Sequence, residues 1–329
     1  MTQAPRARVA RRPVHGVLLL DKPLGLSSNH ALQKAKWLLR AEKAGHAGTL
    51  DPLASGLLVL CFGAATKFSQ LQLEANKCYE AVLQLGVTTT TGDAEGDVLL
   101  RRPVQLEGQD LAALAARFSG PISQVPPMYS ALKKDGKALY DYARAGQTLE
   151  RESRRVTIHE LSLAWVQDAN QQPALKARVC CSKGTYIRTL AEDIGEAMAC
   201  GAHLSRLRRL TTSSFSLAQS VTLEALEVMT ESERISSLLP VEALLAGLPR
   251  ITLEPSETTR FLSGLPRRGH WDDASLVAVY GPEQMLLGSA RVHAGGLTPV
   301  RLLNTDEISQ IKLAHAPAAS TLHPDESIS

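Results

Sequence analysis

The stretch GHAGTLDPLASGLLVL, residues 45–60, combines a glycine-rich segment, a single acid and an apolar run. The acid is Asp51, and the letters LLVLCFG at 57–63 are typical of a short buried strand. Asp-Pro is a common helix start, with Asp51 as N-cap and Pro52 at the first helical position. Because Gly56 follows at once, such a helix would be about one turn long. Two interpretations of Asp51 therefore stay open, a helix cap and a functional carboxylate.

Length and composition set the broad class of the protein. The chain has 329 residues, of which 21% are charged, and this length is typical of about two domains. No apolar run approaches the roughly 20 residues that span a bilayer. Residues 1–16 hold arginines but no apolar segment that could serve as a signal peptide. We expect a cytoplasmic protein without a membrane partner.

The five cysteines give little sign of a structural role. An odd count without regular spacing is not a disulfide framework. Cys180 and Cys181 are neighbours in a predicted strand, so their side chains should point to opposite faces. Cys200 and His203 have the spacing of metal ligands but lack a convincing second pair. The sequence therefore predicts no metal site.

The net charge of +3 is unevenly distributed. Residues 1–16 hold four arginines and no acid, so the remainder of the chain sums to −1. Three internal clusters are basic: Lys133, Lys134 and Lys137; Arg151, Arg154 and Arg155; Arg206, Arg208 and Arg209. Separated basic patches on a near-neutral body favour a polyanion-binding surface, because phosphate contacts dominate nucleic-acid affinity. Ordinary solvated faces are the alternative.

Hydrophobic periodicity predicts an alternation of strands and helices. Ser27 and Ser28 are candidate caps of a helix whose buried side carries Ala31, Ala35, Leu38 and Leu39. The expected strands are 15–21, 57–62, 77–87, 156–166 and 174–182, and the other expected helices are 109–118 and 184–199, the last with a buried stripe of Ile187, Leu190, Ile194 and Met198. The order lacks βαβ regularity and favours an α+β fold over a doubly wound sheet.

The chain divides into segments of different amino-acid composition. Residues 1–13 are expected to form a flexible basic arm and residues 14–248 the main domain. Within it, 126–155 combine prolines, glycines, tyrosines and clustered Lys/Arg, which indicates an exposed excursion from the core. Short strand-like pieces over 249–316 predict a small β-rich domain. Residues 317–329 are predicted to be a disordered tail.

Arg188 is the second informative charge. If Thr185 caps the helix after it, Arg188 lies in the first turn, where the helix dipole disfavours a cation. It should therefore face a specific anion, either a phosphate or a catalytic carboxylate that the pairing keeps ionised. Tyr186 and Tyr79 are flat surfaces that could stack on a base, or packing residues. Sequence spacing does not prove that these residues meet Asp51.

Seven segments, taken in order, resemble a known family: GVLLLDKPLGLSS, GHAGTLDPLASGLL, ATKFSQ, KCYEA, MYSALKKDGKALYDYAR, CSKGTYIRTLAEDIGE and CGAHLSRLRRL. Together they closely resemble the bacterial TruB family of tRNA pseudouridine synthases, densely over about 14–212. The resemblance implies a pseudouridine synthase fold, with a mixed, largely antiparallel central sheet flanked by helices and loops. It also implies a C-terminal PUA-like RNA-binding domain and makes 126–155 an RNA-clamping thumb.

The resemblance implies an isomerase that converts uridine 55 in the T-loop of tRNA to pseudouridine. The base is detached at N1, turned and rejoined to the sugar through C5, without cofactor or metal. Such an enzyme must flip the base out of the stack to reach its reacting atoms. The implied partner is the T-arm stem-loop of tRNA, bound by a monomer that can also assist tRNA folding.

Roles for single residues follow from the same resemblance. Asp51 would be the nucleophile, attacking the sugar or the base or taking part in glycal formation, and Arg188 would pair with it. Tyr79 would stack on the flipped base and is a candidate acceptor of its C5 proton. His46 would fill the space that the base leaves. The remaining assignments are Tyr186 and Leu207 in the base pocket, Lys22 in support of the loop, and Lys133, Lys134, Lys137, Arg206, Arg208 and Arg209 on the RNA backbone.

Two other classes of protein could share some of these features. A non-catalytic RNA-binding protein or tRNA chaperone would use the basic patches without needing Asp51. A glycoside hydrolase would need a second acid suitably placed. The sequence shows no second acid beside the Asp51 motif.

Overall fold

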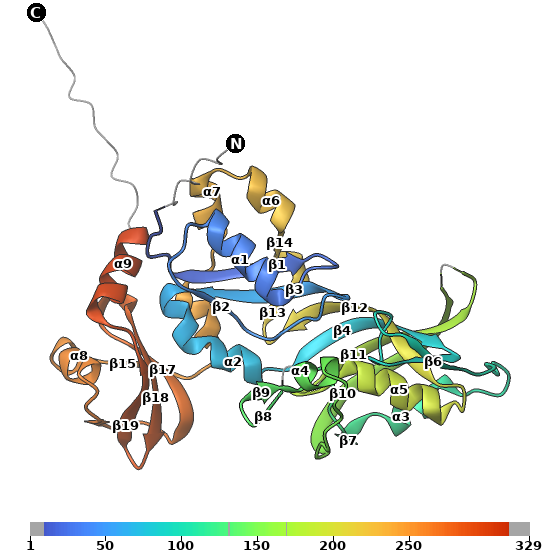
Figure 1. Cartoon of the computed structure of the whole chain (residues 1–329). Coiled ribbons are helices and arrows are strands. Elements are labelled where there is room, and N and C mark those ends of the chain that lie inside the picture. The colour runs from blue at the N-terminus through green and yellow to red at the C-terminus, as the bar shows by residue number, and fades with distance from the viewer. Residues whose placement is uncertain (1–9, 131, 169, 316–329) are drawn as a thin grey trace, which may run out of the picture.

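The computed structural model describes residues 10–130, 132–168 and 170–315. Figure 1 shows a long sheet with helices on it and, at the C-terminal end of the chain, a smaller second sheet. The predicted tail and most of the predicted basic arm lie outside the described residues.

The central sheet has ten strands, in the order β14-β1-β3-β12-β4-β11-β10-β7, with β2 on β3 and β13 on β12. The strands are β1 (Gly16–Lys22), β2 (Ala44–His46), β3 (Ala54–Phe62), β4 (Lys77–Leu85), β7 (Gly120–Gln124), β10 (Arg154–Gln167), β11 (Pro173–Cys181), β12 (Ala202–Thr212), β13 (Phe215–Ser216) and β14 (Val221–Thr222). β1 is parallel to β14 and β3 to β12, and the other neighbouring strands of this sheet are antiparallel. The mixed, largely antiparallel sheet of an α+β fold is confirmed.

Helices cover one face of this sheet and share a single apolar core with it. They are α1 (Ser28–Leu38), α5 (Ile187–Ala197) and α6 (Leu223–Val228), with α3 (Leu111–Arg117) beside β10 and α7 (Glu231–Ser236) after α6. Both predicted stripes, on α1 and on α5, are buried. A Cβ on Gly195 would lie 2.2 Å from the backbone nitrogen of Ala202, so this glycine lets α5 approach β12 closely.

The other face of β1 and β3 packs against the C-terminal domain. That domain is a five-stranded sheet in the order β15-β17-β18-β19-β16. Its elements are β15 (Arg250–Thr252), α8 (Pro255–Leu262), β16 (Arg267–Arg268), β17 (Ala274–Tyr280), η4 (Pro282–Gln284), β18 (Leu286–His293), β19 (Gly296–Leu302) and α9 (Thr305–His315). Val17 and Val59 of the central sheet belong to one core with Phe261 and Val279 of this domain. The expected β-rich domain is therefore present and docked.

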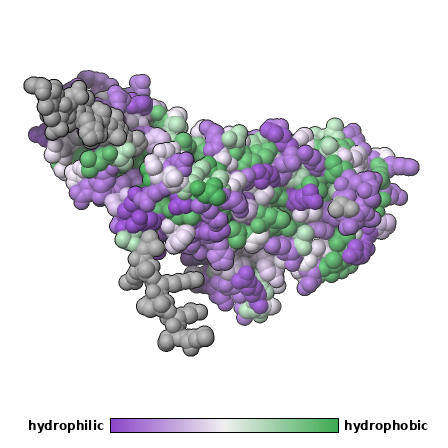
Figure 2. Space-filling view, turned by 90° about the horizontal axis from the view of Figure 1, so that it is seen from above, coloured by the Kyte–Doolittle hydropathy of each residue, from purple (hydrophilic) through white to green (hydrophobic). Residues whose placement is uncertain are grey.

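Short elements link the two sheets and tie them together. They are η1 (Gly63–Phe68), α2 (Ser69–Glu74), η2 (Leu217–Gln219) and η3 (Val241–Leu245). The ammonium of Lys67 in η1 donates to the carbonyl of Leu302 at 2.8 Å and pairs with Glu307 at 2.5 Å. Figure 2 shows the elongated molecular surface, on which small patches of hydrophobic residues are scattered among hydrophilic residues. Among the described helices, none has both the length and the apolar character to cross a membrane.

Two hairpins project from the main body. One pairs β5 (Val87–Thr89) with β6 (Val98–Arg101), and the other pairs β8 (Lys133–Lys134) with β9 (Lys137–Ala138). The second belongs to the excursion, turns at Asp135–Gly136 with positive φ at both residues, and leads into α4 (Leu139–Arg144). An Asp-Gly pair is well suited to such a turn. The three lysines of this hairpin are exposed.

One disulfide, between Cys78 and Cys180, was not expected from the sequence. The two residues are 102 positions apart but directly opposite each other in the pairing of β4 with β11. Cys181, the next residue, is free and buried in the helix-side core. The adjacent cysteines therefore do face opposite sides of their strand, and strand register places Cys180 beside Cys78.

Candidate active site

Asp51 lies in the loop between β2 and β3, and no helix follows it. The backbone nitrogen of Ala54 donates to the Asp51 carbonyl at 3.0 Å, which turns the chain directly into β3. Gly56 in β3 has φ +100°, and a Cβ there would lie 2.3 Å from the Arg209 carbonyl of the neighbouring strand. Gly56 thus lies in the pairing of β3 with β12. The helix-cap interpretation of Asp51 is wrong, and its side chain is free for another task.

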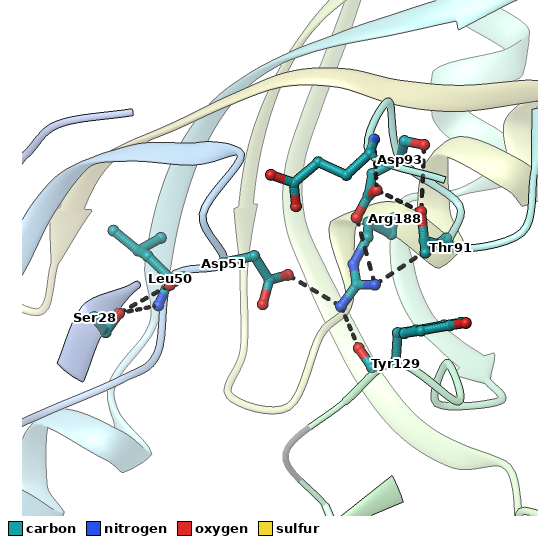
Figure 3. Close-up of polar contacts among 8 residues, drawn as sticks. Ser28, Leu50, Asp51, Thr91, Asp93, Tyr129 and Arg188 are labelled. Atoms are coloured by element: carbon teal, nitrogen blue, oxygen red, sulfur yellow. Dashed lines mark hydrogen bonds and ion pairs between the residues drawn. The ribbon is translucent and has the colours of Figure 1, made fainter. Parts of the chain in front are cut away.

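Arg188 and Asp51 form an ion pair of 3.0 Å between Nη2 and Oδ2, as expected (Figure 3). The arginine side chain is 8% exposed and the carboxylate 45%. Arg188 is the second residue of α5, whose N-cap is Tyr186 and not Thr185. The Thr185 hydroxyl instead donates to the Ser182 carbonyl. Arg188, a cation in the first turn of α5, therefore faces the partly exposed carboxylate of Asp51.

Further contacts fix the guanidinium of Arg188. Nη1 donates to the Thr91 carbonyl at 3.1 Å and lies 3.5 Å from Oδ2 of Asp93, while Nη2 donates to the Tyr129 carbonyl at 2.7 Å. Asp93 is itself buried and accepts from the Thr91 hydroxyl. A buried arginine needs such compensation, because an unpaired charge in the interior is costly. The sequence analysis missed Asp93, which lies in a turn-rich segment without a local signal.

A first cavity of about 360 Å³ opens beside Asp51. Its lining includes the residues expected in the base pocket: Asp51, Tyr79, Tyr186, Arg188 and Leu207. These residues come from the Asp51 loop, β4, the start of α5 and β12. The fold thus brings together residues whose proximity could not be shown from sequence spacing. The volume is at the lower end of small-ligand pockets, which are about 300–1,000 Å³.

Tyr79 and Arg209 are directly opposite each other in the pairing of β4 with β12. Burial raises the pKa of Tyr79, and the guanidinium of Arg209 acts in the opposite direction. Arg209 is 1% exposed and donates to the carbonyls of Leu57, at 2.7 Å, and Gly48, at 3.0 Å. The expected contact of Arg209 with the RNA backbone is therefore wrong. This arginine holds the glycine-rich segment before Asp51.

Arg206 and Arg208 point away from the first cavity. Side chains alternate along a strand, so they lie on the face opposite Leu207 and Arg209. Arg208 binds both carboxylate oxygens of Asp21, at 2.7 and 3.2 Å. Arg206 is exposed on that same outer face. Neither residue therefore lies in the first cavity, and their expected contacts with the RNA backbone stay predictions.

A second cavity of about 510 Å³ lies on the other side of Asp51. Asp51 and Arg188 line both cavities, whereas His46 lines the second. Burial, together with Arg209, lowers the pKa of His46, so its imidazole is neutral at pH 7. The lining of the second cavity also includes Ser28 from α1 and Tyr140 and Arg144 from α4. The site is thus a pair of cavities with the carboxylate at their border and the excursion as a shared wall.

Lys22 lies beneath the loop that follows β1. It is fully buried, and its ammonium donates to the carbonyls of Pro23 at 2.9 Å and Leu26 at 2.5 Å. Burial lowers the pKa of Lys22 to about 8, partly offset by the negative charge of Asp51. Its hydrogen bonds hold the loop directly after β1, and the supporting role that the family resemblance implies stays a prediction.

A second acid does stand near Asp51, contrary to the sequence analysis. Asp93 and Glu95 both line the second cavity. Asp93 is engaged by Arg188 and Thr91, whereas Glu95 is exposed. Among the described residues, no group of three or more His, Cys, Asp or Glu side chains could hold a metal ion.

Sequence comparisons match the chain to one family. Residues 36–187 match the model described as "TruB family pseudouridylate synthase (N terminal domain)", and residues 188–246 match "tRNA pseudouridylate synthase B C-terminal domain". A tRNA pseudouridine synthase B of Verminephrobacter eiseniae is 61% identical over 96% of this chain and 97% of its own. One of Burkholderia mallei is 57% identical over 92% and 99%.

Solved structures share the fold. A chain of "Structure of H/ACA RNP bound to a substrate RNA containing 2'-deoxyuridine" has a TM-score of 0.66 at 23% identity, with 89% of this chain and 86% of that chain covered. A chain of "Crystal Structure of a Cbf5-Nop10-Gar1 Complex" has a TM-score of 0.66 at 25% identity, with 89% and 87% covered. In both cases the likeness extends over 89% of this chain.

Proposed function

The chain belongs to the TruB family of pseudouridylate synthases, and from this we propose that it converts uridine 55 in the T-loop of tRNA to pseudouridine. The family supports the coarser statement directly: the protein is an isomerase that pseudouridylates tRNA. The position of the uridine and the mechanism are our proposal. We also propose, from the family resemblance, that a monomer suffices.

The observation that carries the proposal is the Asp51–Arg188 pair at the border of the two cavities. The first cavity offers the flat ring of Tyr79 and the apolar side chain of Leu207 to a nucleobase that has left the stack. The second cavity offers His46 to the RNA that the base has left. A carboxylate between them would reach the sugar that joins base and backbone.

The reaction needs three changes at the nucleoside. The bond from the sugar C1′ to N1 breaks, a bond from C1′ to C5 forms, and a proton leaves C5 while N1 gains one. Asp51 would act as the nucleophile, on the sugar or the base or in glycal formation, and each route needs an ionised carboxylate. Arg188 would keep that carboxylate ionised and oriented. Tyr79 would stack on the base and is the candidate acceptor of the C5 proton.

A product analysis tests the function. The protein is incubated with a T-arm stem-loop that carries labelled uridine, and the RNA is then digested to nucleosides. We expect pseudouridine at the target position and none in a stem-loop with cytidine there. Free uracil would indicate a hydrolase that uses Asp51 with Glu95. Tight binding without product would instead support a non-catalytic tRNA chaperone.

The excursion supplies a prediction about binding. Replacing Lys133, Lys134 and Lys137 by alanine should weaken binding to every T-arm sequence about equally. These lysines are exposed, and phosphate contacts carry charge but little sequence information. If all three contact phosphates, the slope of log affinity against log salt should fall by about 2 to 3. The measurement is affinity against salt on a T-arm stem-loop and a scrambled hairpin.

A matched control variant removes three positive charges elsewhere on the surface. Lys34, Lys176 and Lys312 are surface lysines that line neither cavity, and each pairs with a glutamate. Their triple alanine variant should keep the salt slope of the wild type. An unchanged slope in the excursion variant would remove the hairpin from the RNA interface. A loss confined to the T-arm would show that it reads shape or sequence.

A further inference from the structure

The backbone on both sides of Asp51 is held by a segment more than 20 residues earlier in the chain. The Ser28 hydroxyl donates to the Leu50 carbonyl at 2.9 Å and accepts from the Leu50 nitrogen at 2.7 Å (Figure 3). The Gly25 nitrogen donates to the Pro52 carbonyl at 2.8 Å. Residues 25–28 therefore hydrogen-bond to the backbone of the residues immediately before and immediately after Asp51.

The position of Ser28 in its helix leaves its hydroxyl free for this contact. Ser27 is the N-cap of α1 and accepts from the His30 nitrogen. Ser28 is the first helical residue, is 2% exposed and points to the Asp51 loop. The two candidate caps of the sequence thus have different tasks, and capping explains only the first of them.

The two hydrogen bonds of Ser28 restrain rotation of the loop. The Leu50 nitrogen belongs to the peptide group before that residue, and its carbonyl belongs to the peptide group that ends at the Asp51 nitrogen. One hydroxyl therefore fixes two successive peptide planes next to the carboxylate. Arg188 fixes the carboxylate itself at the far end of the side chain. Together they restrain Asp51 at both ends.

We propose that Ser28 is a positioning residue, which sets the direction of the Asp51 carboxylate by fixing the backbone at Leu50. The proposal rests on the proposed function of Asp51. Catalytic groups must be held close to their productive geometry, and a misplacement of about 1 Å can cost about 100-fold in rate. Arg188 alone cannot prevent such a shift, since an ion pair tolerates movement of the backbone behind it.

The test compares Ser28→Ala with a variant that loses a similar hydroxyl. Thr230 at the start of α7 also donates and accepts, both toward Glu233, and lies outside both cavities. We expect Ser28→Ala to lower the single-turnover rate on the T-arm stem-loop by about 10- to 100-fold. RNA affinity should stay within about threefold, because both hydrogen bonds of the hydroxyl go to the Leu50 backbone, although Ser28 also lines the second cavity. Thr230→Ala should keep the wild-type rate.

Two further measurements separate positioning from a general loss of structure. Ser28→Thr keeps the hydroxyl and should recover most of the lost rate. Hydrogen exchange of the amides of Thr49, Leu50, Asp51 and Leu53 should be faster in Ser28→Ala than in wild type or Thr230→Ala, with or without RNA. A wild-type rate and wild-type exchange in Ser28→Ala would overturn the proposal, as would equal losses in the alanine and threonine variants.

The exchange measurement also distinguishes this proposal from the proposed function. If wild-type protein forms no pseudouridine, the function fails, and exchange still reports whether Ser28 holds the loop. If wild type is active and Ser28→Ala is equally active, only the positioning role fails.

Discussion

Asp51→Asn is expected to abolish pseudouridine formation, with a single-turnover rate reduced by more than about 1,000-fold. The amide keeps the size of the side chain but loses the anion that every proposed route requires. RNA affinity should stay close to that of the wild type, because Asp51 is one of many residues that line the two cavities. The fold should survive, since Arg188 keeps Asp93 as a buried counter-charge. The measurement is the single-turnover rate together with affinity for the T-arm stem-loop.

Asp21→Asn is the matched control for this variant. Asp21 also pairs with an arginine, Arg208, but lines neither cavity. Its loss should leave the rate unchanged. If Asp51→Asn retained activity within tenfold of the wild type, Asp51 would not be the nucleophile.

Under the proposed mechanism, the position of Asp51 between two cavities would require the target base to leave the RNA helix. A stacked base would keep its reacting atoms out of the first cavity, whose walls are formed by Tyr79, Tyr186 and Leu207. His46 lies in the second cavity, on the other side of the carboxylate. The flipped base would therefore occupy the first cavity and His46 the second. The sugar would lie at the border of the two cavities, next to Asp51.

Regular elements could be predicted from the sequence where one face is apolar. The stripes of α1 and α5 and the alternation in β4 have the predicted burial. β12 was missed as a strand because Arg206, Arg208 and Arg209 gave it the character of a basic surface cluster. Its central place between β3 and β4 buries Arg209. Charge alone does not show which side of a strand a residue occupies.

The site was predictable only in part, for a related reason. The resemblance supplied Asp51, Arg188 and Tyr79, but Asp93 and Ser28 act through contacts across 95 and 22 residues. Local sequence contains no sign of such contacts, since they depend on how loops from different elements meet. The Cys78–Cys180 bond is a third case, since strand register places the two cysteines beside each other.

Arg188→Lys should lower the turnover number by about 100-fold or more while KM changes little. The guanidinium contacts Asp51, Asp93 and the carbonyls of Thr91 and Tyr129 at once. An ammonium is a compact charge without the planar fork, so it cannot keep all four contacts in one geometry. A lysine in this buried position would also tend to lose its proton, because burial disfavours the charged form.

Lysine is therefore a demanding substitution at this position, since it preserves the charge but removes the geometry. Arg208→Lys, on the outer face of the same sheet, is the control and should keep the wild-type turnover number. Kinetics on the T-arm stem-loop separate two roles of Arg188. A loss confined to KM would mean that Arg188 binds a phosphate of the RNA and does not orient Asp51. Full activity in the lysine variant would show that a positive charge near Asp51 is sufficient, and that the network through Asp93 serves stability alone.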